Sequence, residues 1–385
     1  MRRSTERILT THAGSLPRPD DLRDILLAKD EGRPYDQAQF AIRVRSAVAE
    51  VVQRQIAAGL DIINDGELSK RSFSTYARER LSGFEERPPS PGERPSMISG
   101  RDMPEFAEYF ASRGGFGGAL ANARQVFCSA PLKYIGQTAV QADIANFKAA
   151  LVGVQVSETF LPAIAPGTIE HWMRNRYYPS DEAYLEAIAD AMREEYQAIV
   201  DAGFLLQIDD PDLPDAWQIH PHMSVPEYRK FAELRVEALN HALRGIPPAR
   251  VRLHVCWGSY HGPHKYDIPL RDIVDLILKV NVEGYSIEAS NPRHEHEWRV
   301  WDDVKLAEGK VLIPGVVGHA TDFIEHPELV AERLVRYARL VGRENVIAGT
   351  DCGLGGRVGH PKIVWAKFEA LAEGAQLATR QLWRR

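Results

Sequence analysis

Cysteine is scarce in this sequence, and the three present, Cys128, Cys256 and Cys352, are far apart in a chain of 385 residues. Three scattered cysteines do not make the disulfide framework of small secreted proteins, so we expect a cytoplasmic protein. No run approaches the roughly 18 apolar residues of a membrane-spanning helix. The N-terminal residues also lack the apolar segment of a signal peptide. The sequence therefore predicts neither a membrane span nor export.

Positive charge is not in excess either, because the net charge is −6, and this gives no electrostatic support for binding nucleic acid. With 44% hydrophobic and 26% charged residues, the composition is typical of a soluble globular protein. The length suffices for one large barrel or for two domains. No glycine-rich phosphate loop follows the first apolar segment, which argues against an open, doubly wound sheet.

Short apolar segments recur along the chain, with helix-like stretches between them. The apolar segments are residues 7–15, 60–67, 160–169, 204–211, 251–258, 285–290, 310–318 and 345–353. The stretches 38–60, 180–203 and 327–342 have apolar residues at helical spacing and a glycine at or near their ends. This alternation predicts parallel strands joined by helical crossovers, and eight repeats predict a (β/α)8 TIM barrel.

One segment, between the second and third predicted strands, is too long for a simple crossover. Residues 68–158 contain the proline- and glycine-rich stretches EERPPSPGERPSM (85–97) and GGFGGALANAR (114–124). Connections of this length are uncommon in compact domains and often have a function. We expect a single barrel domain over residues 1–385 with an insertion at about 75–150, which forms a hairpin and a lid over the barrel mouth.

Reactive side chains stand at the predicted carboxyl ends of the strands, where TIM barrels carry their chemistry. They are Ser15, Glu67, Asp209, His254, Cys256, Glu288, His319 and Cys352. His254 and Cys256 are two positions apart on one predicted strand, so their side chains share a face. Zinc prefers thiolate and imidazole, accepts a carboxylate and usually binds four ligands. We predict a zinc site made of His254, Cys256, Glu288 and Cys352.

Other histidines and the remaining cysteine have less support as ligands. The histidines of SYHGPHKY and NPRHEHEW lie in predicted loops, where a solvated side chain is the usual state; they are His261, His264, His294 and His296. Cys128, in QVFCSAP, is expected to be a packed thiol, with a contact between lid and substrate as the alternative.

The other polar strand ends suit an amino acid beside the metal. Glu67 and Asp209 would face the zinc across the barrel mouth and could hold an ammonium group, although such carboxylates also serve as helix caps. Backbone amides at residues 13–15, before a helix, would suit a carboxylate. Trp172, in TIEHWMRNR, is either a core residue or a stacking platform for a flat ring.

Motifs along most of the chain resemble the C-terminal catalytic barrel of cobalamin-independent methionine synthases. HVC (254–256), IEAS (287–290) and TDCGLGGR (350–357) are similar to the three zinc-bearing segments of that family. Its barrel strands and substrate walls resemble THAGSLPRP (11–19), GLDIINDGE (59–67), GTIEHW (167–172) and QIDDP (207–211). The chain looks like a short form of the family without the N-terminal barrel.

The resemblance implies a role for each predicted site residue. His254, Cys256, Glu288 and Cys352 would bind zinc. Glu67 and Asp209 would hold the ammonium group of the substrate and Ser15 would lie near its carboxylate, while Trp172 and Asp209 would border a pterin. His319, in PGVVGHAT, matches the family's proton donor to the departing methyl carrier. The implied reaction is zinc-dependent methyl transfer from a folate or another carrier to a thiol such as homocysteine, which gives methionine.

Departures from the family pattern affect the methyl donor more than the zinc. The residues that flank Trp172, His171 and Met173, differ from those of the family pattern. The segment before His319 is one residue shorter than in the long form. One alternative is a zinc-dependent alkyltransferase or lyase for another thiol, of the epoxyalkane:coenzyme M transferase type. Glu67 and Asp209 favour an amino-acid thiol, because a sulfonate would prefer Lys or Arg.

A second alternative is a non-catalytic scaffold that zinc stabilises. The expected partners are a small thiol and a methyl donor, with neither nucleic acid nor membrane. A homo-oligomer is compatible with the sequence.

Overall fold

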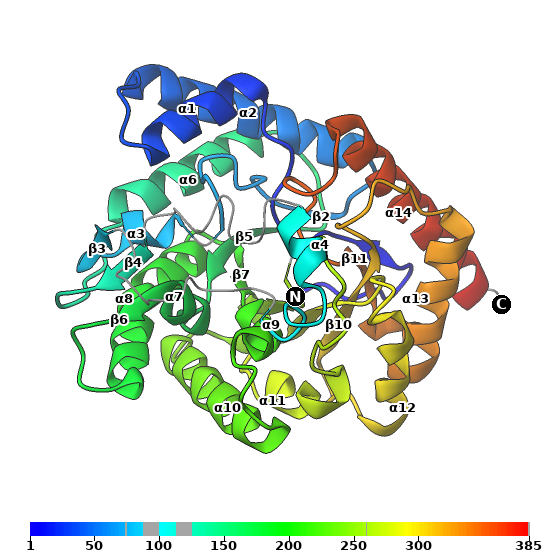
Figure 1. The fold of residues 1–385 in the computed structure, drawn as a ribbon. Helices are drawn as coiled ribbons and strands as arrows, with labels where there is room; N and C mark the ends of the chain where they lie inside the picture. The colour runs from blue at the N-terminus through cyan, green and yellow to red at the C-terminus, as the bar shows by residue number, and fades with distance from the viewer. Residues whose placement is uncertain (74, 88–99, 113–124, 259, 384–385) are drawn as a thin grey trace.

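The centre of the protein is a parallel barrel (Figure 1), seen in a computed structural model that describes residues 1–73, 75–87, 100–112, 125–258 and 260–383. The strands follow the order β1-β11-β10-β9-β8-β7-β5-β2 in an eight-stranded sheet. Their bounds are β1 (Leu9–Thr10), β2 (Ile62–Ile63), β5 (Glu158–Ile164), β7 (Leu205–Asp209), β8 (Val251–Val255), β9 (Gly284–Glu288), β10 (Val311–Val317) and β11 (Ile347–Thr350). Each of the eight predicted segments overlaps one strand, although β5 and β9 begin two residues and one residue earlier than predicted, and this confirms the (β/α)8 class.

The barrel is nearly closed where its first two strands meet. The amide of Asp61 donates to the carbonyl of Thr10 at 3.1 Å, and the Thr11 hydroxyl donates to the carbonyl of Ile62 at 3.1 Å. The neighbouring strands of the sheet pair in parallel, from β1 with β11 round to β5 with β2. The carboxyl ends of all eight strands therefore meet at one end of the barrel.

Helices surround this barrel in Figure 1. The longer ones are α1 (Asp20–Asp30), α2 (Gln37–Ala57), α6 (Gln137–Ala150), α8 (Asp181–Asp201), α10 (Val225–Ala242), α13 (Pro327–Val341) and α14 (Pro361–Leu382). Shorter helices are α3 (Ala77–Arg80), α4 (Ala107–Ser112), α7 (Pro166–Trp172), α9 (Asp212–Ile219), α11 (Val274–Leu278) and α12 (Val300–Asp303). Single 3-10 turns are η1 (Pro248–Arg250), η2 (Leu270–Asp272), η3 (Glu295–Arg299) and η4 (Arg343–Asn345).

The three predicted helices correspond to α2, α8 and α13, and their ends follow the expected capping chemistry. The Ser180 hydroxyl accepts the amide of Ala183 at 3.3 Å and so satisfies one of the free donors at the start of α8. Helix α13 ends at Gly342, whose φ of +90° suits glycine. In the described part of the chain, no helix is both long and apolar enough for a membrane crossing.

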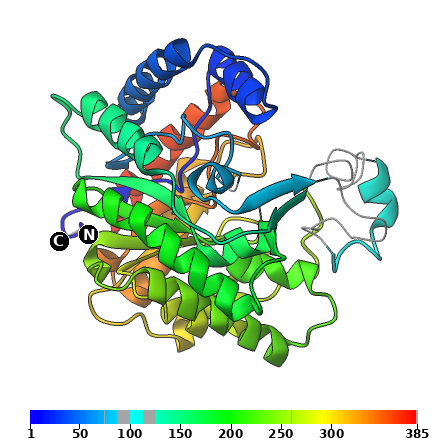
Figure 2. The same ribbon diagram turned by 90° about the vertical axis from the view of Figure 1, so that its left-hand side faces the viewer.

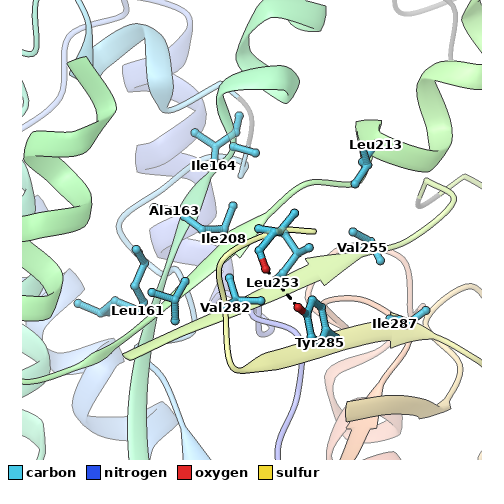
Figure 3. Close-up of a cluster of buried hydrophobic side chains, with 14 of the residues drawn as sticks. Leu161, Ala163, Ile164, Ile208, Leu213, Leu253, Val255, Val282, Tyr285 and Ile287 are labelled. Carbon is cyan, nitrogen blue, oxygen red and sulfur yellow. Dashed lines mark hydrogen bonds between the residues drawn. The ribbon is translucent and has the colours of Figure 1, made fainter. Parts of the chain in front are cut away.

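Alternation along the strands divides apolar from polar side chains. On β8 and β9, residues such as Leu253, Val255, Tyr285 and Ile287 join the hydrophobic layer beneath the helices (Figure 3). The opposite face fills the barrel interior, where a small apolar cluster sits at the beginnings of the strands: Leu9, Ile62, Phe160, Leu205, Val311, Ile313 and Ile347. The inward positions nearer the carboxyl ends are polar, so the barrel is closed by apolar residues at one end and carries its chemistry at the other.

Additional structure lies between β2 and β5, as predicted. Strands β3 (Phe84–Arg87) and β4 (Gln125–Cys128) pair in antiparallel fashion, as a hairpin would, and β6 (Met173–Asn175) adds to β4 in parallel. Helix α6 packs between α2 and α8 and belongs to the outer helical layer. Helix α4 projects from the end of the barrel opposite to the chain termini (Figure 2). Most of the two stretches expected to form the lid lies outside the described residues.

Candidate metal centre and active site

Two thiols and one imidazole meet at the carboxyl ends of β8 and β11. The ligand atoms of His254, Cys256 and Cys352 all lie within 4.8 Å of one another, and the two sulfurs are 3.9 Å apart. His254 is held through Nδ1, which is 3.3 Å from the hydroxyl of Ser286, while its buried Nε2 has no hydrogen-bond partner among the described residues. These atoms fit a metal ion of zinc's chemistry, because borderline ions prefer thiolate and imidazole donors.

The two thiols of this cluster differ in acidity. The thiol of Cys256 donates a hydrogen bond to Cys352 and, helped by the nearby imidazoles of His254 and His319, this places the pKa of Cys352 well below its usual value. The same hydrogen bond, together with burial, raises the pKa of Cys256 well above the usual thiol range. Cys352 is therefore the thiol that loses its proton first.

Glu288 belongs to a second buried group, together with His319 and Asp351, whose ligand atoms also lie within 4.8 Å of one another. One oxygen of Glu288 accepts the amide of Trp257 at 2.8 Å, and the other accepts the side-chain amide of Asn291 at 3.0 Å. Its charge nevertheless acts on Cys256 and contributes to the raised pKa of that thiol. The structure thus places Glu288 beside the thiol cluster rather than within it.

His319 is buried just after β10, and in the part of the chain that the structure describes neither of its ring nitrogens has a hydrogen-bond partner. Asp351 instead accepts the amides of Ala289 and Ser290 at 2.8 and 2.9 Å, and the Ser290 hydroxyl at 2.6 Å. Burial and the neighbouring Glu288 raise the pKa of Asp351 to about 7. This group ties the ends of β9 and β11 together behind the thiol cluster.

A cavity of about 550 Å³ opens onto the thiols, and seven of the nine predicted site residues line it: Ser15, Glu67, Trp172, Asp209, His254, Cys256 and Cys352. Glu288 and His319 are not among the lining residues. Several other residues that line the cavity were not predicted from the sequence. They include Arg18, Arg71, Phe73, Asp212, Asp215, Tyr260 and Arg357. Arg18 and Arg357 lie inside the motifs THAGSLPRP and TDCGLGGR, and this position is the feature of the sequence that could have identified them as site residues.

The cavity brings the two predicted ammonium-binding carboxylates together. Burial raises the pKa of Glu67, and burial and the charge of Glu67 raise the pKa of Asp209 to about 8. The amide of Gln207 donates to Asp209 at 2.6 Å. Gly14, at φ +141°, allows the close approach of Glu67, because a β-carbon there would lie 2.5 Å from the Glu67 carboxylate. A cationic group bound between the two carboxylates would stabilise both ionised forms.

The loop histidines only partly match their prediction. His261 and His296 are exposed, as expected, but His264 and His294 are buried, so the prediction of solvated side chains is wrong for them. Both bind the same oxygen of Asp267, at 2.7 and 3.0 Å. The two loops are far apart in sequence, and this shared carboxylate was not visible in their local pattern. The Cys128 thiol is buried, as predicted.

The catalytic-domain model of the cobalamin-independent synthases matches residues 126–373. The chain belongs to this family. The methionine synthases of Thermococcus kodakarensis and Sulfurisphaera tokodaii are 23% and 25% identical to it, over 97% of this chain and 94% and 93% of theirs. Among solved structures, a B12-independent methionine synthase from Shewanella sp. W3-18-1, in complex with selenomethionine, superposes with a TM-score of 0.75 at 20% identity. The match covers 98% of this chain and 99% of that one, so this member of the cobalamin-independent synthase family shares the whole barrel fold with it.

Proposed function

We propose that this protein is a zinc-dependent methyltransferase that transfers a methyl group to the thiol of homocysteine and so forms methionine. The observation that carries the proposal is the cluster of His254, Cys256 and Cys352, which opens into a cavity with the paired carboxylates of Glu67 and Asp209. A closed structural metal site would have no need of such a cavity. Membership of the family and its curated methionine synthases support the same reaction.

The metal would be held by His254, Cys256 and Cys352, with Glu288 as the fourth ligand. A bound zinc ion supplies a Lewis acid that lowers the pKa of a coordinated substrate thiol and produces a thiolate at neutral pH. Ser286 orients the imidazole of His254 through Nδ1, which leaves Nε2 available as a donor. A thiol-rich metal site also works best in a reducing compartment, which supports a cytoplasmic location.

The amino-acid part of the substrate would bind across the same cavity. Glu67 and Asp209 would receive its ammonium group, while Ser15 and the nearby Arg18 suit its carboxylate. A sulfonate thiol could also meet Arg18 and the other arginines of the cavity, Arg71 and Arg357. It would bring no cation of its own to Glu67 and Asp209, two buried carboxylates whose pKa values burial raises, so we favour the amino-acid thiol.

His319 is the proposed acid for a carrier whose leaving atom requires a proton. Its ring nitrogens make no other hydrogen bond, which leaves them available for this role. Because His319 does not line the cavity, it would deliver the proton through an intervening group. Glu288 and Asp351 lie beside it.

The proposal is tested by Cys352→Ser, with Cys128→Ser as the matched control. Both variants replace a thiol by the same nearly isosteric hydroxyl, but Cys128 does not line the cavity and has no role in the proposed mechanism. We expect Cys352→Ser to lose bound zinc, measured by elemental analysis, and binding of homocysteine, measured by calorimetry, while Cys128→Ser retains both. Purified protein without zinc, together with unchanged homocysteine binding in Cys352→Ser, would contradict the proposal.

A further inference from the structure

Two carboxylates of the cavity have no role in the function proposed above. Asp212 and Asp215 both belong to the first turn of α9. They line the cavity and are each only 4% exposed. One oxygen of each, Oδ2 of Asp212 and Oδ1 of Asp215, is buried without a hydrogen-bond partner from the residues that the structure describes. His171 lies 3.0 Å from the other oxygen of Asp212. In the described part of the chain, no basic side chain forms an ion pair with Asp215.

Burial of an ionised carboxylate without a partner is unfavourable, so such a group is often retained because a ligand supplies the missing charge. Asp215 is close to the reactive thiols. It packs against Gly258, two residues after Cys256, where a β-carbon would lie only 3.0 Å from its Oδ1 atom. A cation held by Asp215 would therefore be near the metal centre.

Aromatic side chains accompany these carboxylates. Phe73, Trp172 and Tyr260 all line the same cavity. The Tyr260 ring is held by stacking on His264, with 4.1 Å between ring centroids. Methylated cations donate no strong hydrogen bonds, and aromatic faces combined with negative charge are the surroundings that bind them best.

The basic residues of the cavity come from other segments of the chain than Asp212 and Asp215. Arg18, Arg71 and Arg357 come from the segments after β1, β2 and β11, and in the described residues none forms an ion pair with Asp212 or Asp215. Arg71 lies 4.0 Å from Asp30, and Arg18 donates to the carbonyls of Glu67 and Lys70. Among the described residues Arg357 forms no ion pair, so it is the arginine that we assign to a carboxylate of the donor. A ligand with a cationic end and a carboxylate end would find both partners in this one cavity.

The position of His319 also bears on the methyl donor. A methyl group on a neutral amine leaves behind a strongly basic nitrogen, which requires a proton from a nearby acid. His319, the residue proposed for that task, does not line the cavity. A sulfonium or quaternary ammonium donor leaves as a neutral thioether or tertiary amine, and it requires no proton.

We infer that Asp212, Asp215 and the three aromatic residues form a subsite for a methylated onium donor, a sulfonium or quaternary ammonium compound that also carries a carboxylate. This inference rests on the proposed function, because the acceptor is the homocysteine thiolate. The thiolate sulfur forms a bond to the methyl carbon with its own electron pair. The bond between that carbon and the onium sulfur or nitrogen breaks, and its electron pair returns to the leaving atom. The proton of the homocysteine thiol goes to solvent when the thiolate forms, so charge and atoms balance.

The first experiment supplies the zinc-loaded protein and homocysteine with four donors: S-methylmethionine, glycine betaine, and 5-methyltetrahydrofolate as its mono- and triglutamate. Methionine is measured by mass spectrometry with a deuterated methyl group. We expect an onium donor to give at least a tenfold higher kcat/KM than either folate. If a folate is used and neither onium is, the inference is wrong but the proposed function stands. If no donor methylates homocysteine, both are wrong.

The second experiment uses Asp212→Asn and Asp215→Asn, with Asp210→Asn as the matched control. Asp210 is a neighbouring buried carboxylate that does not line the cavity and accepts the hydroxyl of Thr168 at 3.2 Å. Binding of trimethylsulfonium to the metal-free protein is measured by calorimetry and Trp fluorescence. We expect each of the first two variants to weaken this binding at least tenfold, with less than a twofold change in Asp210→Asn. Equal changes in all three variants, or no binding to the unmodified protein, would overturn the inference.

Discussion

Two pairs of buried histidines in this protein differ in how fully their ring nitrogens are paired. In His264 and His294, all four nitrogens are hydrogen-bonded, to Asp267, Glu297 and the carbonyl of Tyr260. In His254 and His319, three of the four nitrogens have no hydrogen-bond partner within the described ranges of the chain. Since buried polar groups are normally satisfied, the first pair indicates structure and the second indicates a place where something binds.

The largest effect that this comparison predicts is the loss of metal in His254→Gln. The metal affinity should fall by more than about 100-fold, beyond the range seen when only outer groups around a ligand are changed. Without metal, the free energy of unfolding should change by only about 1 kcal/mol, because the contact of Nδ1 with Ser286 is the weak hydrogen bond that is lost. Metal analysis and urea unfolding measure the two quantities. Retained metal, or a large loss of stability in the metal-free protein, would place His254 with the structural pair.

The reverse pattern is expected for His294→Ala. Its removal takes the imidazole away from Glu297 and leaves Asp267 with only His264 of its two histidines, and breaking a buried pair in this way costs about 3 kcal/mol, the lower end of the usual range. His296→Ala is the control two residues later, where an exposed side chain should matter by about 0.5 kcal/mol or less. Urea unfolding of both variants measures the difference. Equal stabilities would show that the paired histidines are not structural.

Stability should also depend on pH through His294. Burial lowers the pKa of His294, but hydrogen bonds to Asp267 and Glu297 outweigh this and raise it to about 9. Because the folded value lies above the unfolded one, the contribution is fully present below about pH 6.5 and is lost as the pH rises towards 9. The loss should reach at most about 3 kcal/mol. Unfolding measured from pH 6 to 9.5 should show a steeper decline in the unmodified protein than in His294→Gln, and parallel curves would contradict this assignment.

The barrel and the thiol cluster could be predicted because each depends on short-range regularities. Alternation with a period of two places His254 and Cys256 on one face, and their position at a strand end places them at the barrel mouth. Cys352 lies just after β11, in another of the predicted apolar segments. Because the barrel strands are parallel, the carboxyl ends of β8 and β11 lie at the same end of the barrel. The eight strands were recognisable for the same reason, since their inner and outer faces are both buried.

The acidic part of the cavity could not be predicted, because it depends on how α9 packs after β7. Asp212 and Asp215 read as the acidic first turn of a helix, and only the packed structure turns them towards the cavity. His264 and His294 lie 30 residues apart in loops, and their pairing depends on Asp267, which bonds to both. The position of Glu288 beside the cluster also follows from its hydrogen bonds to Trp257 and Asn291, which strand periodicity does not contain.

The smallest predicted effect concerns Ser286, the residue that orients the unpaired histidine. Its hydroxyl lies 3.3 Å from Nδ1 of His254, so Ser286→Ala should lower the metal affinity by about tenfold, at the lower end of the range for such supporting residues. Ser180→Ala, which removes the N-cap of α8 away from the cavity, is the control. It should cost about 1 kcal/mol of stability and leave the metal affinity unchanged. Competition with a chelator measures the affinity, and an unchanged value in Ser286→Ala would mean that the barrel interior, rather than one hydroxyl, holds the imidazole in place for the metal.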